Sequence, residues 1–465
     1  MRNRLSSRPA IMPRTGIALA LLLACVFTIS LHAQATAASP PDTPAGHTLS
    51  AWLDAMNSAD QAKIQHYADT IDKHQHVDAM LSFARQTGGF TLVSIERSEP
   101  NLITFRVHEK GGSNLGFGTL KVSPGNPPTV QLFNLRIIPS GAEFDDPPLD
   151  AGQRTRVIDG ITSNLTKLYV YPDVAAKMNT YVQARADHGD YNDITSGAVF
   201  ADALTKDLRA VSNDRHLHVD YAPFKQSVTS PHEQPTPDDL SRMRRQMSDN
   251  NCGFRKVEIL PRNIGYLKFD MFGPPAVCAP TATAAMNLLA HTRALIIDLR
   301  ENGGGDPAMV AFIVSYLFDT HEHINDLYNR SDNETTQYWT LPWMPGERLT
   351  AQPVYVLTSQ GTFSGAEEFA YDLKNLKRAT IVGETTGGGA HPVRGLTIDP
   401  HFSIAVPVAR PINPVTRTDW EGTGVTPDYK TSRDDALPTA IKLAEAKLQA
   451  DDTPPVPGHS ASPTR

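Results

Sequence analysis

The sequence lacks a long basic stripe, a membrane-length apolar run and an appreciable number of cysteines. Its 43 lysines and arginines stand against 50 acidic residues, a formal net charge of -7, so nucleic acid is not an expected partner. The apolar run from Ile17 to Leu31 is shorter than the roughly 20 residues that cross a bilayer. With 40% apolar and 20% charged residues, the composition excludes a wholly disordered, collagen-like or polytopic membrane protein.

The first residues have the pattern of a secretory leader. Residues 1–16 carry four arginines and no acidic residue, and the small-residue sequence Ala33-Gln34-Ala35 follows the apolar run. We therefore expect residues 1–35 to be a signal peptide, and the chain to be exported to the periplasm or the extracellular space without an integral span after leader removal. A retained N-terminal anchor and a lipoprotein box ending at Cys25 are the alternatives.

Three cysteines are present, and Cys25 would leave with the leader. Cys252 and Cys278 remain in the exported chain. Two thiols in an oxidising compartment predict one disulfide bond, and two buried free thiols remain the alternative.

The length of 465 residues predicts two or three domains. We expect residues 47–142 to form a small α+β domain, because an amphipathic helix around Trp52 precedes several strand-like runs separated by turn residues. This order of elements suggests a cone of the nuclear-transport-factor-2-like kind. It offers no convergent acid, base or nucleophile.

The rest of the chain has two further patterns. Residues 152–240 are dominated by helical periodicity and predict a helical subdomain. Residues 252–448 alternate compact β-rich runs with helical stretches, which is typical of an α/β domain with buried strands. Residues 449–465 form a Pro/Ser-rich tail that we expect to be disordered.

Two loops after expected strands carry residues suited to acyl-transfer chemistry. Gly303 and Gly304 lie in a glycine-rich turn whose bare backbone N–H groups could stabilise an oxyanion. Ser364 stands at a strand-to-helix turn, with the N–H of Gly365 at the positive end of the helix. Ser364 could equally be an ordinary helix N-cap.

Two histidines compete for the role of general base. His216 lies in a strand-like segment, and His391 follows a run of glycines. A histidine is the usual partner of a serine nucleophile, although most histidines in a chain are structural. Glu421 is a candidate carboxylate for orienting the imidazole, and a loop salt bridge is its alternative role.

Several motifs, in order, give residues 157–448 a resemblance to a known family. They are Ile264-Gly265-Tyr266-Leu267, Asp298-Leu299-Arg300-x-Asn302-x-Gly304-Gly305, Ser364-Gly365-Ala366-Glu367, Val382-Gly383-Glu384-Thr385-Thr386 and Gly424-Val425-x-Pro427-Asp428. Together they resemble the tail-specific (C-terminal-processing) serine proteases, in particular the branch of interphotoreceptor retinoid-binding protein. The resemblance implies a crotonase-like α/β catalytic domain at 252–448, with 152–240 as its helical N-terminal subdomain.

The resemblance also implies roles for residues. Ser364 would be the nucleophile, and Gly365 with Gly303 or Gly304 would form the oxyanion hole. The Ser-Lys branch places its lysine where this chain has Gly389, so no such dyad forms. The tricorn-like branch uses a histidine and a glutamate, which map to His216 and Glu421.

Two departures from the family are visible. Arg215 stands where the tricorn-like branch has a supporting serine, so Glu421 or Asp214 would bond His216 directly. The spacing between His216 and Ile264 leaves too little chain for a PDZ module of about 90 residues. Recognition of a substrate's C-terminal carboxylate is therefore not expected.

We therefore expect an exported serine peptidase acting on peptide or protein substrates, without metal or organic cofactor. A carrier of apolar ligands on the same fold is the first alternative, because relatives in the retinoid-binding branch act as carriers. An esterase or amidase using Ser364 is the second. The sequence does not indicate the oligomeric state.

Overall fold

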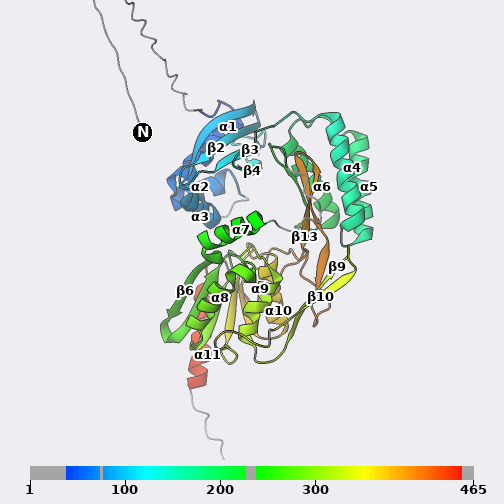
Figure 1. Ribbon diagram of the computed structural model, residues 1–465. Coiled ribbons are helices and arrows are strands. Elements are labelled where there is room, and N and C mark those ends of the chain that lie inside the picture. Colours follow the sequence, from blue (N-terminus) through cyan, green and yellow to red (C-terminus); the bar gives the residue numbers. More distant parts are fainter. Residues whose placement is uncertain (1–37, 74–76, 227–236, 453–465) are drawn as a thin grey trace, which may run out of the picture.

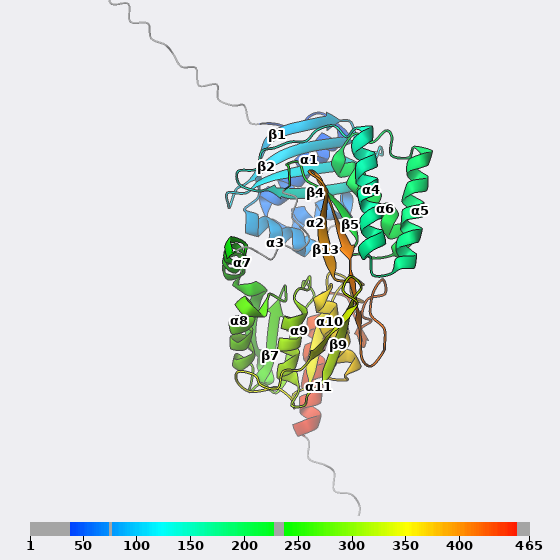
Figure 2. The same cartoon turned by 45° about the vertical axis from the view of Figure 1, so that its right-hand side comes forward.

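The computed structural model describes residues 38–73, 77–226 and 237–452. The expected signal peptide and most of the expected tail lie outside the described residues. Figures 1 and 2 show three parts: an N-terminal α+β part, a layer of helices beside it and a larger α/β part below them. No helix among the described residues has the length and apolarity needed to cross a membrane.

The N-terminal part packs three helices against an antiparallel meander. Trp52 on the first helix lies between the rings of Phe90 and Phe133, at centroid distances of 5.2 and 4.9 Å. The expected amphipathic helix and strand-like runs are confirmed. The elements are α1 (Pro44–Ser58), α2 (Gln61–Thr70), α3 (Val77–Thr87), β1 (Phe90–Glu99), β2 (Leu102–Glu109), β3 (Leu115–Val122) and β4 (Val130–Ile138).

The second part is not purely helical, which corrects the sequence-based expectation. A small antiparallel sheet, ordered β13-β14-β5, packs beneath its helices, and two of these strands come from the far end of the chain. The local pattern of these two strands does not show that they leave the α/β part, because their pairing with β5 joins segments far apart in sequence. The elements are α4 (Ala151–Leu168), α5 (Pro172–His188), α6 (Gly197–Ser212), β5 (His218–Tyr221), β13 (Val393–Asp399) and β14 (Phe402–Pro407).

The third part is built on a six-stranded sheet ordered β16-β12-β11-β8-β7-β6. The five strands from β16 to β7 are parallel, and only β6 is antiparallel to its neighbour. The strands are β6 (Phe254–Leu260), β7 (Ile264–Phe269), β8 (Ala294–Asp298), β11 (Val354–Thr358), β12 (Ala379–Gly383) and β16 (Tyr429–Lys430).

Helices cover both faces of this sheet, which explains its nearly continuous apolar strands. On β8, Leu295 and Ile297 pack into the core with three helices, whereas Ala294 and Ile296 face the last helix. The α/β fold expected from the alternation is thus confirmed. The helices are α8 (Pro275–Leu288), α9 (Pro307–Val314), α10 (Gly365–Asn375) and α11 (Ala436–Asp452).

The helix α11 continues past Leu448, so residues 449–452 are helical where the tail was expected to begin. A further antiparallel sheet, ordered β10-β9-β15, and the helix α7 were not expected. Short 3-10 turns lie at Asn251–Gly253, Pro261–Asn263 and Ser315–Leu317. The remaining elements are α7 (Pro237–Asp249), β9 (His323–Asn329), β10 (Glu334–Trp339) and β15 (Ala409–Ile412).

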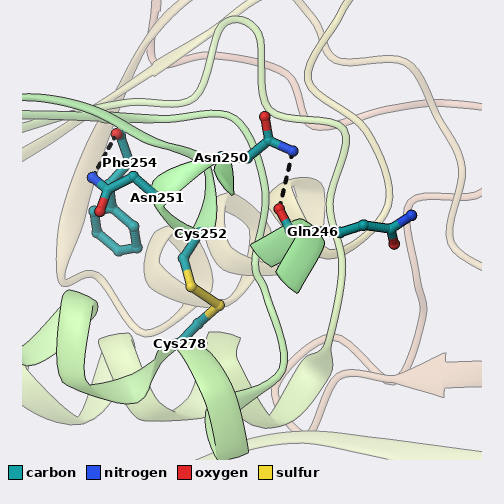
Figure 3. The surroundings of a disulfide bond; sticks show 6 residues. All are labelled: Gln246, Asn250, Asn251, Cys252, Phe254 and Cys278. Carbon is teal, nitrogen blue, oxygen red and sulfur yellow. Dashed lines mark hydrogen bonds between the residues drawn. A yellow bond between two sulfur atoms is a disulfide. The ribbon is translucent and has the colours of Figure 1, made fainter. Parts of the chain in front are cut away.

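A disulfide bond joins the segment after α7 to α8. Cys252 and Cys278 are bonded, and both residues are buried in the core between the sheet and its helices (Figure 3). The bond closes a loop across a sequence separation of 26 residues. It therefore restricts the unfolded chain through the entropy of loop closure.

Replacing both cysteines by alanine is expected to lower the free energy of unfolding of the α/β part by about 3 kcal/mol, because the closed loop is then opened in the unfolded state. Urea denaturation followed by circular dichroism measures the effect. Wild-type protein in reductant should match the double variant. An unchanged midpoint in both samples would contradict the prediction.

Candidate active site

Three loops meet at the carboxyl edge of the large sheet. The adjacent parallel strands β8, β11 and β12 end at Asp298, Thr358 and Gly383. In open parallel sheets this edge is where ligands bind, because the following loops converge there. The loops carry the glycine-rich turn, Ser364 and the run that leads to His391, so segments far apart in sequence become neighbours.

Ser364 occupies a strained turn between β11 and α10. Its backbone has φ 55° and ψ -123°, whereas an ordinary N-cap residue is extended. The Ser364 N–H donates to the carboxylate of Glu367 at 2.9 Å, one turn into the helix. Ser364 and Gly365 both line a cavity of about 240 Å³. The backbone geometry therefore resembles a nucleophile elbow more closely than a simple cap.

The glycine-rich turn directs its N–H groups differently from the expectation. Gly303 donates its N–H to the carbonyl of Asp270 at 3.1 Å, and Gly304 donates to Oδ1 of Asn302 at 2.9 Å. Both N–H groups that the sequence suggested for an oxyanion hole are thus engaged within the fold. Gly305 instead lines the cavity.

The backbone pairing of the turn determines which way Gly305 faces. The N–H of Phe272 donates to the Gly304 carbonyl, and the N–H of Asp306 donates to the Phe272 carbonyl, both at 2.8 Å. In this parallel bridge, Phe272 bonds the carbonyl of the residue before Gly305 and the N–H of the residue after it. The N–H of Gly305 itself therefore points away from Phe272. Gly365 lies on the side of Gly305 that faces away from Phe272, since a Cβ added at Gly365 would lie 3.1 Å from the Gly305 nitrogen.

His216 lines the same cavity as Ser364. Its ring packs against Phe363, with 4.6 Å between centroids, and its Nδ1 is buried without a hydrogen-bond partner among the described residues. Burial lowers the pKa of His216 to about 4, so the ring is neutral at ordinary pH. A Cβ added at Gly389 would lie only 2.8 Å from Cε1 of His216.

His391 lies behind the cavity wall rather than on it. Only 3% of its surface is exposed, and its Nδ1 lies 2.7 Å from a carboxylate oxygen of Asp214. Burial opposes the charged ring, but the carboxylates of Asp214 and Asp419 outweigh it and raise the pKa of His391 to about 9. His391 is therefore a cation paired with a buried acid, and its neighbours Ala390 and Pro392 form the wall.

Asp214 and Glu421 lie beside both histidines. Asp214 is fully buried and accepts hydrogen bonds from the Tyr169 hydroxyl and from the backbone N–H of His216, each at 3.1 Å. Glu421 accepts from the N–H of Arg215 at 3.2 Å, and burial followed by the charge of Asp214 raises the pKa of Glu421 to about 7. Arg215 thus contributes its backbone, not the missing serine hydroxyl.

Asp214, His216 and Glu421 each offer an atom within 4.8 Å of the others, a spacing that could also suit a cation. Their carboxylate oxygens already accept backbone N–H groups, however. Among the described residues neither carboxylate bonds the His216 ring, whose Nδ1 has no partner, because Asp214 pairs with His391 instead. The direct bond to His216 expected from the sequence therefore does not form.

Sequence reasoning missed several residues of the cavity. Asn325 and Tyr338 come from the unexpected strands β9 and β10, and Trp420 stands directly before Glu421. Glu368 was adjacent to the recognised Ser364–Glu367 motif and is the one whose position could have been inferred, since it lies one helical turn beyond Ser364.

Comparison with known families gives two matches that cover much of the chain. Residues 263–431 match "Peptidase family S41". Residues 152–256 match the "N-terminal domain of Peptidase_S41 in eukaryotic IRBP".

Individual relatives match parts of the chain. "Carboxyl-terminal-processing peptidase 2, chloroplastic" of Arabidopsis thaliana is 29% identical over 36% of this chain and 31% of its own length. "Carboxyl-terminal-processing protease" of Synechocystis is 29% identical over 46% of this chain and 45% of its own length. The chain thus spans less than half the length of these relatives. A solved crystal structure from Parabacteroides merdae superposes with a TM-score of 0.46, at 18% identity over 64% of this chain and 98% of that one.

The two histidines are expected to titrate far apart. The ring of His216 should stay neutral down to about pH 4 because it is buried, and that of His391 should stay charged up to about pH 9 because Asp214 is its partner. NMR titration of histidine ring signals, assigned with His216→Ala and His391→Ala, measures both. Two titrations near pH 6.5 would contradict this arrangement.

Proposed function

Because the chain belongs to peptidase family S41, which residues 263–431 match, and has the matching N-terminal domain at residues 152–256, we propose that it is an exported serine peptidase acting on peptide or protein substrates. The observation that carries the proposal is the single cavity lined by Ser364, Gly365, Gly305 and His216. It combines a hydroxyl, an imidazole and two backbone N–H groups, which are the groups that acyl transfer requires. Export rests on the leader-like pattern of residues 1–35.

The proposed reaction begins when the Ser364 hydroxyl attacks the scissile carbonyl carbon and passes its proton to His216. The N–H groups of Gly365 and Gly305 stabilise the oxyanion that forms, and loss of one donor would cost on the order of 3 kcal/mol. His216 then gives the proton to the leaving amine. Water, activated by the same imidazole, hydrolyses the acyl-enzyme.

Glu421 and Asp214 would stabilise the imidazolium that His216 becomes during this reaction. In the resting protein the charge of Asp214 opposes the desolvation of His216, but burial prevails and keeps the ring neutral. The depressed pKa of His216 determines the expected pH dependence of activity. The acidic limb of activity should lie well below the value near pH 6 of an ordinary imidazole.

This site differs from a serine-lysine dyad in two ways. Gly389 stands where the dyad would have its lysine, and the neighbouring titratable group is His216, whose pKa is low. An alanine Cβ at Gly389 would come within 2.1 Å of the Phe363 ring as well as 2.8 Å of His216. The imidazole therefore occupies the space next to the position where the Ser-Lys branch carries its base. Processing of substrate C-termini, which the names of the relatives describe, is not part of the proposal, because the chain between His216 and Ile264 is too short for a PDZ module.

Ser364→Ala and His216→Ala are each expected to abolish peptide turnover without unfolding the chain, because the first variant lacks the nucleophile and the second lacks the general base. Labelling by a fluorophosphonate probe, with circular dichroism as the folding check, measures the effect on the serine. Ser331→Ala, an exposed serine outside the cavity, is the control and should label like the wild type.

Absence of labelling in the wild type, together with saturable uptake of fatty acids or retinoids, would support the carrier instead. Cleavage of esters but not peptides would support the esterase alternative. An inactive His391→Ala variant combined with an active His216→Ala variant would mean that the base is His391.

Gly389→Ala is expected to reduce kcat at least 100-fold, because its Cβ displaces the rings of Phe363 and His216. Gly395→Ala is the matched control, since a Cβ there meets no atom within 4 Å. Steady-state kinetics on one fluorogenic peptide library compares the two. Equal activity of both variants would show that the imidazole does not need its observed position.

A further inference from the structure

The cavity beside Ser364 has apolar walls and one polar end. Leu327, Pro411 and Val393 form part of its walls, whereas Glu368 and Asn325 lie together on its lining. Its volume of about 240 Å³ is below the roughly 300–1,000 Å³ of sites for drug-sized ligands. The cavity therefore has the size for one amino-acid side chain next to the reacting serine.

The polar end offers hydrogen-bond acceptors that the protein does not fully use. Nδ2 of Asn325 donates to Oε1 of Glu368 at 3.1 Å, which leaves Oδ1 of Asn325 as the remaining amide atom. Asn325 is 2% exposed, and its Oδ1 has no hydrogen-bond partner within the described ranges. A buried acceptor without a donor is unfavourable, so this atom indicates a donor that arrives with a ligand.

Acidic groups crowd this end, and each disfavours the ionisation of the others. Burial, and then the charge of Asp306, raise the pKa of Glu368 to about 7. Asp372, one turn further along α10, is also buried, and the charge of Glu368 raises its pKa further. Tyr338 lies on the same cavity, and its pKa is raised by burial and by the charges of Glu368 and Asp306. A cationic group entering here would relieve this repulsion.

We propose that Glu368 and Asn325 form the end of a substrate subsite that selects lysine or arginine on the acyl side of the scissile bond. The proposal rests on the proposed peptidase function of Ser364. The apolar walls would hold the methylene stem, and the cationic end would donate to the Glu368 carboxylate and to Oδ1 of Asn325. An acidic side chain would be repelled, and an apolar one would leave Oδ1 of Asn325 without a donor.

The test compares covalent probes that differ only in this side chain. Peptidyl phosphonate esters carrying lysine or its uncharged counterpart norleucine phosphonylate Ser364 with loss of a phenol. Rates of labelling are measured at pH 8, where Glu368 is ionised, beside a fluorophosphonate that has no such side chain. The lysine probe is expected to react at least tenfold faster than the norleucine probe.

The possible outcomes distinguish the proposed subsite from the proposed peptidase function. Labelling by the fluorophosphonate, with equal rates for the two peptidyl probes, would overturn the subsite and leave the proposed function intact. Absence of labelling by all three probes would overturn the proposed function and the subsite with it. A faster norleucine probe would show that the cavity selects apolar side chains.

Two variants test whether the preference for lysine over norleucine depends on Glu368. Glu368→Gln keeps the shape of the side chain and is expected to reduce the ratio of lysine to norleucine rates at least tenfold. Asp372→Asn, a buried acid of the same helix outside the cavity lining, is the matched control and should keep the ratio within about threefold.

If circular dichroism shows that Glu368→Gln is unfolded, Asn325→Ala provides the second test and is expected to lower the same ratio. The ratio would also fall below pH 7 in the wild type as Glu368 takes up a proton, whereas the fluorophosphonate rate would not follow this change. An unchanged ratio in the folded variants would overturn the proposal.

Discussion

The buried carboxylate of Glu367 holds the candidate site together. It is fully buried and accepts hydrogen bonds from the Ser364 N–H at 2.9 Å, from the N–H groups of Gly388 and Gly389 at 2.6 and 2.8 Å, and from the Thr386 hydroxyl. A buried acid is tolerated only when its oxygens are satisfied in this way. Because one carboxylate joins the serine turn to the glycine run, the strained serine, the imidazole beside Gly389 and the cavity between them depend on the same group.

The second constraint is the division of charge between the two histidines. His391 pairs with Asp214 and takes the stable positive charge, whereas His216 is buried against Phe363 and stays neutral. A neutral imidazole on the cavity wall is ready to accept a proton, and the acids behind it would stabilise the charge it acquires. The proposal of His216 rather than His391 as the general base therefore rests on the fact that His391 already has a carboxylate partner.

Some features could be predicted because they rest on local patterns. The continuous apolar run of β8 predicted a buried parallel strand, and the serine at the strand-to-helix junction predicted the turn at Ser364. The proposed oxyanion donor could not be predicted within the glycine run. Gly303 and Gly304 are engaged by Asp270 and Asn302, and only the pairing of Phe272 with Gly305 directs the Gly305 N–H toward Gly365. Neighbouring glycines of one turn thus differ in their hydrogen-bond partners, some of which lie in the segment after β7.

The sequence alone determined the alternation of strands and helices, the family motifs and the identity of the serine, since these are written in contiguous residues. Tertiary structure decided what depends on distant segments meeting: the pairing of His391 with Asp214, the sharing of Cys252 and Cys278 in one bond, and the position of Asn325 beside Glu368. The physical reason is that burial and hydrogen-bond satisfaction belong to the surroundings of a side chain. Those surroundings exist only after the chain has closed around it.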